Sequence, residues 1–316
     1  MVYLCAEDLH LRESFARGDL PSKQAVTDLL TEIFSTTPVI TPTGAVIESN
    51  LYQQSSRFDI KSTVLNNIYA QLELSFGLLR ATTPKYNSYQ YIAQGPTQKD
   101  TSPAATAVRK HSKKAVKWTN IDVEAAAKSS GLHRNDIVDK LQHWNDTRLI
   151  ELKTGGVVNV FRIMKALPQT AQEKRSIAET LYRELVVREQ QELARMQSVI
   201  DLICGSACIA RTLAEHFGDS LPDGKQECGH CTWCETKKPV ERVTRPTQDW
   251  DPKAFNDVLA ACPARDDPRF LARVAFGIGS PRATGDKLSK NKVFGSMEDH
   301  NFVVRTEYAC RDENLD

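Results

Sequence analysis

The sequence has no long apolar run and almost no net charge. No stretch of about 18 apolar residues occurs that would cross a membrane, and Met1–Leu11 has neither the basic start nor the apolar centre of a secretory signal. We therefore expect an intracellular protein with no membrane partner, nuclear if the source is eukaryotic. Lys and Arg number 41 against 40 Asp and Glu, so the net charge of +1 gives no overall attraction to nucleic acid, and any such attraction must be local.

The sequence also lacks the motifs of ATP hydrolysis. It has no Gly-x4-Gly-Lys-Ser/Thr loop to hold phosphates and no Asp-Glu-x-His motif to bind Mg²⁺. Gly277 and Gly279 are separated by one residue, as in nucleotide-binding loops, but no lysine follows at the right place, so a turn is the simpler interpretation. We assign no catalytic residue and expect the chain to be inactive as an ATPase by itself.

The composition is otherwise typical of folded soluble proteins. Of the 316 residues, 41% are hydrophobic and 26% charged, and the length suits about two or three domains. Met1–Cys5 has the pattern of a strand without a partner, as if a preceding motor domain were missing. The helical stretches Ala6–Ala16 and Ser22–Phe34 follow around Gly18–Pro21, which predicts a helical hairpin within residues 1–40.

Residues 45–95 combine a helical pattern with two alternating stretches. Apolar residues follow helical spacing after Arg57, and Leu78–Thr82 and Ser88–Ile92 alternate on either side of a Pro84-Lys85 turn. A helix followed by a hairpin predicts a winged-helix-like unit.

Residues 118–167 repeat this order of elements. Two helices are expected at Asp122–Ser129 and Arg134–Thr147, followed by two strands on either side of Gly155-Gly156. The pattern predicts a second winged-helix-like unit. Between the two units, residues 96–117 are rich in Pro, Thr, Ser and Ala and predict a basic linker. Its cations are Arg109, Lys110, Lys113, Lys114 and Lys117.

The second half of the chain centres on cysteines. A long charged helix, Gln169–Ile203, leads into a cysteine cluster within a helical domain of residues 168–240. Residues 241–316 are expected to form a C-terminal helical extension that includes a helix at Pro252–Ala261. The predicted fold class is mainly α with small β hairpins (α+β).

The cysteine spacing is that of a metal site. Cys228, Cys231 and Cys234 are each separated by two residues, and a fourth thiol comes from Cys204 or Cys208, which share one helix face. Four thiolates form a closed tetrahedral zinc site, whose role is structural because no coordination position stays open.

Other interpretations of the cluster remain open at this point. An iron–sulfur cluster also uses four thiolates, and a buried group of free thiols or a redox pair would need no metal. His216 and His230 are alternative ligands, although lone histidines near such sites are commonly solvated.

Three motifs of the cysteine region resemble the zinc-binding domain of RecQ-family DNA helicases. They are Cys208-Ile-Ala-Arg-Thr-Leu213, Glu215-His-Phe-Gly-Asp219 and Cys228-Gly-His-Cys-Thr-Trp-Cys234. The resemblance implies that Cys208 is the helix ligand, and hence one structural Zn²⁺ per chain held by Cys208, Cys228, Cys231 and Cys234. Ile209-Ala210 replace a pair that is commonly basic or polar in the family, which weakens a DNA role for this turn.

Both ends of the chain are similar to one branch of the same family. Ala6–Ser22 resembles the segment that follows the second motor domain, and Asp266–Met297 resembles the end of these helicases. The resemblance implies the C-terminal region of a helicase without its motor.

Candidate DNA-binding residues lie in two groups. Arg80, Lys85, Tyr86 and Tyr89 lie on or beside the first expected hairpin, where cations would meet phosphate and aromatic rings would stack on bases. The five cations of the linker form the second group. A solvated hairpin with tyrosines packed on its own helix, and a flexible spacer or nuclear-import patch, are the alternatives.

Three functions are consistent with these patterns. The first is a zinc-stabilised, DNA-binding accessory region of a RecQ-type helicase, which unwinds DNA in recombination and repair. The second is a subunit or fragment of an active 3'-5' helicase whose ATPase lobes lie on a missing or separate motor chain. The third is a zinc-stabilised protein-interaction module. The expected partner is duplex, forked or single-stranded DNA.

Overall fold

The computed structural model describes residues 4–244, 247–264 and 266–302, which fall into two compact units. Unit 1 contains Met1–Ser35, Tyr52–Ser75 and Leu167–Asp316, and unit 2 contains Thr36–Leu51 and Phe76–Ala166. The division cuts through the expected unit at residues 45–95, because its helices lie in unit 1 and its long strand in unit 2. The strand expected over Met1–Cys5 lies largely outside the described residues, and Leu4 and Cys5 are not in a strand.

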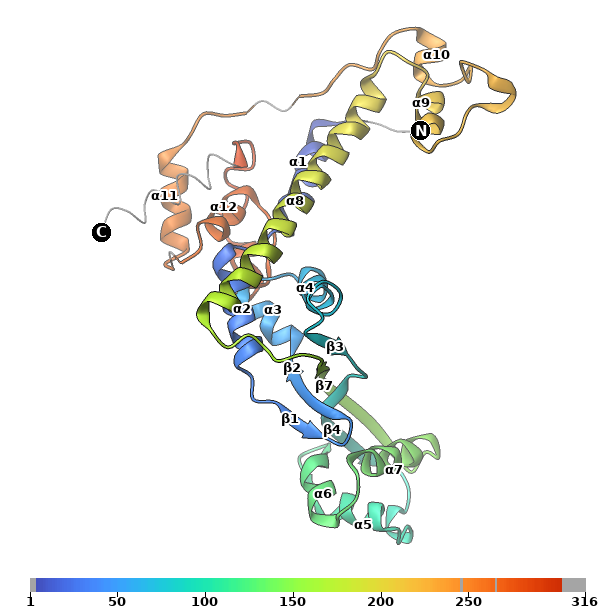
Figure 1. Cartoon of the computed structure of the whole chain (residues 1–316), viewed down its shortest axis with the longest axis vertical. Helices are drawn as coiled ribbons and strands as arrows, with labels where there is room; N and C mark the ends of the chain where they lie inside the picture. Colours follow the sequence, from blue (N-terminus) through green and yellow to red (C-terminus); the bar gives the residue numbers. More distant parts are fainter. Residues whose placement is uncertain (1–3, 245–246, 265, 303–316) are drawn as a thin grey trace. The chain divides into compact units, whose positions relative to one another are not determined.

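Unit 1 is helical. Its first four helices are α1 (Ala6–Gly18), α2 (Lys23–Ser35), α3 (Leu51–Phe58, which begins at the unit boundary) and α4 (Ser62–Leu74), and the 34-residue α8 (Ala171–Cys204) follows after unit 2. The expected helical hairpin is α1 and α2, and both pack on α8, with α2 beside the start of α8 in Figure 1. The buried face of α2 consists of Val26, Leu29, Leu30, Ile33 and Phe34, at the spacing that favours an amphipathic helix.

Three short helices form the C-terminal part of unit 1. They are α11 (Pro252–Ala261), α12 (Pro268–Phe276) and α13 (Pro281–Gly285), followed by the 3-10 turn η3 (Leu288–Lys290). Each helix begins with proline after Asp251, Asp267 or Ser280, whose side chain accepts hydrogen bonds from the first turn. α11 matches the helix expected at Pro252–Ala261, whereas α12 and α13 were not placed individually from the sequence. The helices enclose their own core around Phe255, Phe270 and Met297.

Unit 2 is built on an antiparallel sheet. Its strands are β1 (Val39–Thr41), β2 (Gly44–Ser49), β3 (Leu79–Ala81), β4 (Lys85–Ala93), β5 (Ser112–Lys114), β6 (Thr119–Ile121) and β7 (Ile150–Ile163). The order is β1-β2-β7-β4-β6-β5, and β3 also pairs with β7. The α+β class is confirmed, as is the long helix leading into the cysteine cluster.

The strands pair differently from the two expected hairpins. β3 and β4 do not pair with each other but lie end to end along β7, with Ala81 opposite Phe161 and Lys85 opposite Val158. The chain therefore advances four residues from Ala81 to Lys85 where β7 advances three from Val158 to Phe161, and the extra residue forms a bulge. Pro84 lies in this bulge because it has no N–H to donate to the ladder.

β7 also continues where a turn was expected. Gly155 pairs with Ser88, and Gly156 continues the strand with a φ of 65°. A Cβ at Gly156 would collide with the side chain of Asn87, so glycine is needed for a close approach of β4 rather than for a chain reversal. The two glycines thus allow one strand of 14 residues to pair along its length.

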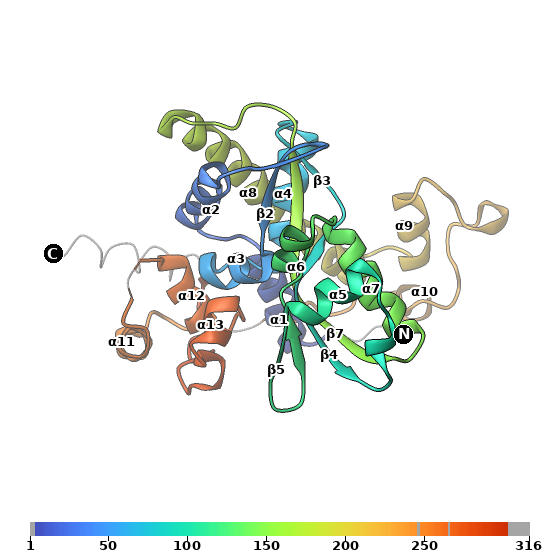
Figure 2. The ribbon, with the colours of Figure 1, turned by 90° about the horizontal axis from the view of Figure 1, so that it is seen from below.

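The segment expected as a linker is folded. Residues 96–117 contain the 3-10 turn η1 (Thr97–Lys99), α5 (Pro103–Lys110) and β5. Small apolar residues on α5, among them Ala105 and Val108, are buried against Trp144 in the core of unit 2, and this burial outweighs the polar composition. Figure 2 shows α5 beside α6 (Val123–Ser130) and α7 (Arg134–Asp146), which match the two expected helices.

Candidate metal centre and nucleic-acid surface

Two short helices and a loop position the four thiols. Thr170 and Glu173 cap the start of α8 reciprocally, and α8 ends at Cys204. Cys208 is the N-cap of α9 (Ile209–His216), and Cys231 is the N-cap of α10 (Thr232–Thr236). Cys208 and Cys231 thus lie at the beginning of a helix, where the first backbone N–H groups have no intrahelical partner.

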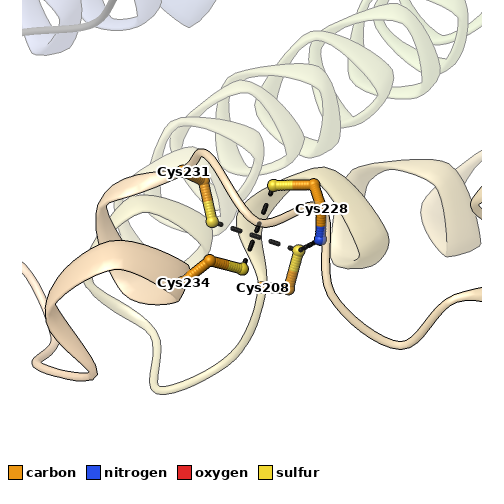
Figure 3. Close-up of side chains that lie close together, drawn as sticks. All are labelled: Cys208, Cys228, Cys231 and Cys234. Atoms are coloured by element: carbon orange, nitrogen blue, oxygen red, sulfur yellow. Dashed lines mark hydrogen bonds between the residues drawn. The ribbon is translucent and has the colours of Figure 1, made fainter.

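The four sulfur atoms converge, as Figure 3 shows. All lie within 4.8 Å of one another, with Cys228 and Cys234 Sγ 3.9 Å apart and Cys231 and Cys208 Sγ 4.0 Å apart. Zinc binds thiolate sulfur at about 2.3 Å, which gives a tetrahedron with edges of about 3.8 Å. The donor set therefore fits one structural zinc ion with all four positions filled by protein.

Backbone hydrogen bonds favour thiolates at two of these positions. Burial raises the pKa of Cys208, but the N–H groups of Arg211 and Cys228 donate to its sulfur and the net pKa is lowered. For Cys231, burial is likewise outweighed, by the N–H groups of Cys234 and Ile209, and its pKa falls to about 6. These two sulfurs are prepared to bind a cation.

The fourth thiol shows why a cation is needed. Burial and the neighbouring thiols raise the pKa of Cys234 to about 11, although the N–H of Gly229 donates to its sulfur. Four negative charges this close repel one another, so full ionisation at neutral pH requires a positive ion between them. Zinc binding would then release protons.

The alternative ligands lie outside the cluster. Cys204 Sγ is 4.0 Å from the carbonyl O of Glu241, His230 Nδ1 is 2.9 Å from the carbonyl O of Cys228, and the His216 ring packs against Phe217. Among the residues that the structure describes, the group able to hold a metal is Cys208, Cys228, Cys231 and Cys234. The structure thus selects Cys208 over Cys204.

Comparison with known proteins agrees with this zinc-binding domain. Residues 169–235, roughly a fifth of the chain, match the family model described as RecQ zinc-binding. The expected resemblance to RecQ-family helicases is confirmed for this region. No curated protein matches the chain. Among the described residues, no helix combines the length and apolar character needed to span a membrane.

The structure brings five of the nine candidate DNA-binding residues together in unit 2. They line an open groove of about 1050 Å³, formed by the start of β4, the end of α5, β5, β6 and the start of α6. These residues are Lys85, Tyr86, Tyr89, Lys110 and Lys113. They come from both expected groups, so the hairpin and linker residues share one surface.

The first group differs in accessibility. Lys85 Nζ lies 2.8 Å from Glu48 and 3.4 Å from Glu124, so its charge is largely neutralised. Tyr89 is only 4% exposed, whereas Tyr86 is 43% exposed. Tyr86 is thus the tyrosine whose ring a ligand could reach.

The second group contains one structural residue and four exposed lysines. Arg109 Nη1 donates to the carbonyl O of Thr97 and of Asp100, both at 2.8 Å, and so holds the loop before α5. The exposed lysines are Lys110, Lys113, Lys114 and Lys117, which lie at the end of α5 and on the β5–β6 hairpin. Arg80 lies on β3 and is exposed, but it is not among the residues lining the groove.

Arg134 is a groove residue that the sequence did not indicate. Its side chain donates to the carbonyl O of Tyr86 at 2.6 Å and to Glu124 at 2.8 Å, and its guanidinium lies 5.7 Å from the centre of the Tyr89 ring. Arg134 begins α7 and reaches β4, 48 positions away in the chain. Helix periodicity reveals the start of α7 but not this long-range contact.

Proposed function

We propose that the chain is a DNA-binding, zinc-stabilised accessory region of a RecQ-type helicase, acting in DNA unwinding during recombination and repair. The observation that carries this proposal is the match of residues 169–235 to the RecQ zinc-binding family, together with the four converging thiols. The sequence contains neither the phosphate loop nor the Mg²⁺-binding motif, so the ATPase lobes that it would serve lie on a missing segment or on a separate motor chain.

A winged helix in unit 2 would supply the DNA contact. Helix α5, strands β5 and β6, helices α6 and α7 and strand β7 follow one another in an order that suits such a domain. The three helices pack on one another around Trp144, which is fully buried. This unit spans the boundary between the expected linker and the second expected unit.

Exposed lysines support phosphate binding by this unit. Within the described part of the chain, the side chains of Lys110, Lys113, Lys114 and Lys117 form no ion pair. Free cations near one another bind phosphates and release counterions, which gives sequence-independent affinity. Lys85 contributes less because two carboxylates neutralise it.

DNA titration and ATP hydrolysis test the proposal. Zinc-loaded protein should bind fluorescent duplex, forked and single-stranded DNA at low salt, and should show no DNA-stimulated hydrolysis by itself. Addition of a polypeptide that carries the ATPase lobes should restore hydrolysis. Folded, zinc-loaded protein that binds none of the DNA forms would contradict the proposal and favour a protein-interaction module.

A further inference from the structure

In the groove of unit 2, the exposed lysines lie on α5 and β5, whereas the cations of β4 and α7 are paired with carboxylates. Lys85, at the start of β4, forms an ion pair with Glu48 at 2.8 Å. Arg134, at the start of α7, forms one with Glu124, also at 2.8 Å. At the end of α5 and on β5, Lys110 and Lys113 are exposed, as are the neighbouring hairpin lysines. A third carboxylate of the groove, that of Asp122, accepts a hydrogen bond from the backbone N–H of Ala125 at 2.9 Å as the cap of α6. Phosphate is therefore favoured at the exposed lysines of α5 and β5 and disfavoured near Glu48 and Glu124.

Tyr86 presents a fixed aromatic surface in this groove. Its ring packs edge-on against the ring of Tyr89, with 6.3 Å between the ring centroids. The carbonyl O of Tyr86 accepts a hydrogen bond from Arg134 at 2.6 Å. Tyr86 is nevertheless 43% exposed, and the next two residues, Asn87 and Ser88, are exposed polar residues that also line the groove. A held, accessible ring beside an amide and a hydroxyl is suited to stacking on a nucleobase and hydrogen bonding to its edge.

These features favour a single strand over a duplex. A duplex presents two phosphate backbones and keeps the faces of its bases stacked inside the helix. The carboxylates of Glu48 and Glu124 would repel the second backbone, and Tyr86 would find no free base face. An unpaired nucleotide places one phosphate near the lysines and one base on the ring.

We infer that this groove binds an unpaired nucleotide of single-stranded nucleic acid, with the base stacked on Tyr86 and the phosphate held by Lys110 and Lys113. The inference rests on the proposed DNA-binding function and specifies the form of DNA that this site takes. Arg134 and Tyr89 are positioning residues in this arrangement, since they hold Tyr86.

Affinity measurements on the full zinc-loaded chain test the inference. The probes are a fluorescent single strand of about 20 nucleotides, longer than the roughly 4 to 16 that one binding fold covers, and the blunt duplex of the same sequence. Tyr86→Ala should weaken single-strand binding about tenfold or more and leave duplex affinity unchanged. Tyr86→Phe should bind as wild type because the ring remains. Tyr52→Ala, at an 82% exposed position of unit 1, is the matched control.

A direct measurement complements the variants. On irradiation, a single strand that carries 5-bromouracil should crosslink to the peptide containing Tyr86. The double variant Lys110→Ala/Lys113→Ala should reduce the yield of this crosslink. Tyr86→Ala with unchanged single-strand affinity, or with equal loss for both DNA forms, would overturn the inference while leaving DNA binding established. Wild-type protein that binds no DNA would overturn both the inference and the proposed function.

Discussion

Arg273 and Asp59 form an ion pair at 3.2 Å although 214 positions separate them in the chain. Their side chains are only 3% and 6% exposed. Asp59 also accepts a hydrogen bond from the backbone N–H of Arg282 at 2.8 Å, and Arg273 donates to the carbonyl O of Leu20. The C-terminal helices α12 and α13 are thus joined through buried charges to the helices that begin unit 1.

Loss of one partner of this pair should destabilise unit 1. Arg273→Met leaves the Asp59 carboxylate buried without its cation, and such a change costs about 3 to 5 kcal/mol of unfolding free energy. The double variant Asp59→Asn/Arg273→Met should recover part of this loss, because no charge then remains buried. Denaturant unfolding of the three proteins measures both effects.

An exposed pair in the same region provides the control. Arg282 contacts Asp266 at 2.9 Å, and the Asp266 side chain is 66% exposed. Asp266→Asn should change the unfolding free energy by no more than about 1 kcal/mol. An equal effect of Arg273→Met and Asp266→Asn would contradict the assignment of a buried, stabilising pair.

Cys208 and Cys204 distinguish the zinc ligand from its neighbour. Cys208→Ser should lose zinc and unfold the segment around residues 197–238, because the metal site and the fold of this segment depend on each other. Cys204→Ser should keep one zinc per chain, because its sulfur lies outside the cluster. Metal analysis of reductant-protected protein and circular dichroism after chelation report the two quantities.

Cys228→Ser should behave as Cys208→Ser does. Full zinc stoichiometry with four-thiolate coordination in Cys208→Ser would refute the ligand set. Zinc should also be lost as the pH falls, since the thiols must be deprotonated to bind it.

Asp100 should make the stability of unit 2 depend on pH. Hydrogen bonds from the hydroxyl and backbone N–H of Ser102, and from Trp144 and Lys140, hold the pKa of Asp100 well below its ordinary value of 3.8. A lowered native pKa contributes stability that is present above 3.8 and is lost as the pH falls toward the native value. Asp100→Asn should therefore cost about 1 to 2 kcal/mol at neutral pH and progressively less below 3.8.

Asp146→Asn is the control for this pH effect. Asp146 is exposed and accepts from Gln142 at 2.8 Å on the surface of α7. Its replacement should have little effect at either pH. A stability loss in Asp100→Asn that stays constant down to pH 3 would contradict the account of Asp100.

Local signals predicted the helices and the metal site. Asp122 caps the start of α6 with its side chain, and Gly131 ends the helix in the left-handed conformation. Asp251 before Pro252 marks the start of α11 in the same way as Asp122 does for α6. The spacing of the last three cysteines predicted a loop that closes on one ion. In each case the physical cause lies within a few residues of the element.

Long-range contacts explain what the sequence did not reveal. Pro84 and Gly156 both suggest chain reversals. Pairing of β3 and β4 with β7 instead places Pro84 in a bulge, and Gly156 of β7 lies where β4 approaches closely. α5 was hidden by polar residues because only Ala105 and its apolar neighbours face the core. Register and burial against distant elements are set by the whole fold.

Arg109 and Lys110 are adjacent cations with different expected roles. Arg109→Ala removes the donor to two backbone carbonyls and should lower stability by about 1 to 3 kcal/mol, with little change in DNA affinity of the folded protein. Lys110→Ala should do the reverse, because its side chain is exposed. Thermal unfolding and DNA titration of both variants separate the roles, and a reversed pattern would show that Arg109 contacts DNA.

The salt dependence of DNA binding reports whether the exposed lysines of unit 2 contact phosphate. Each phosphate neutralised on single-stranded DNA contributes about −0.7 to the slope of log affinity against log salt. If Lys110 and Lys113 together neutralise one phosphate of the strand and Lys114 neutralises a second, their joint replacement by alanine should make the slope shallower by about 1.4. The zinc-loaded triple variant, with alanine at all three lysine positions, should keep its fold and its metal ion. A slope identical to that of the wild-type chain would contradict the account, because the exposed lysines of unit 2 would then take no part in binding DNA.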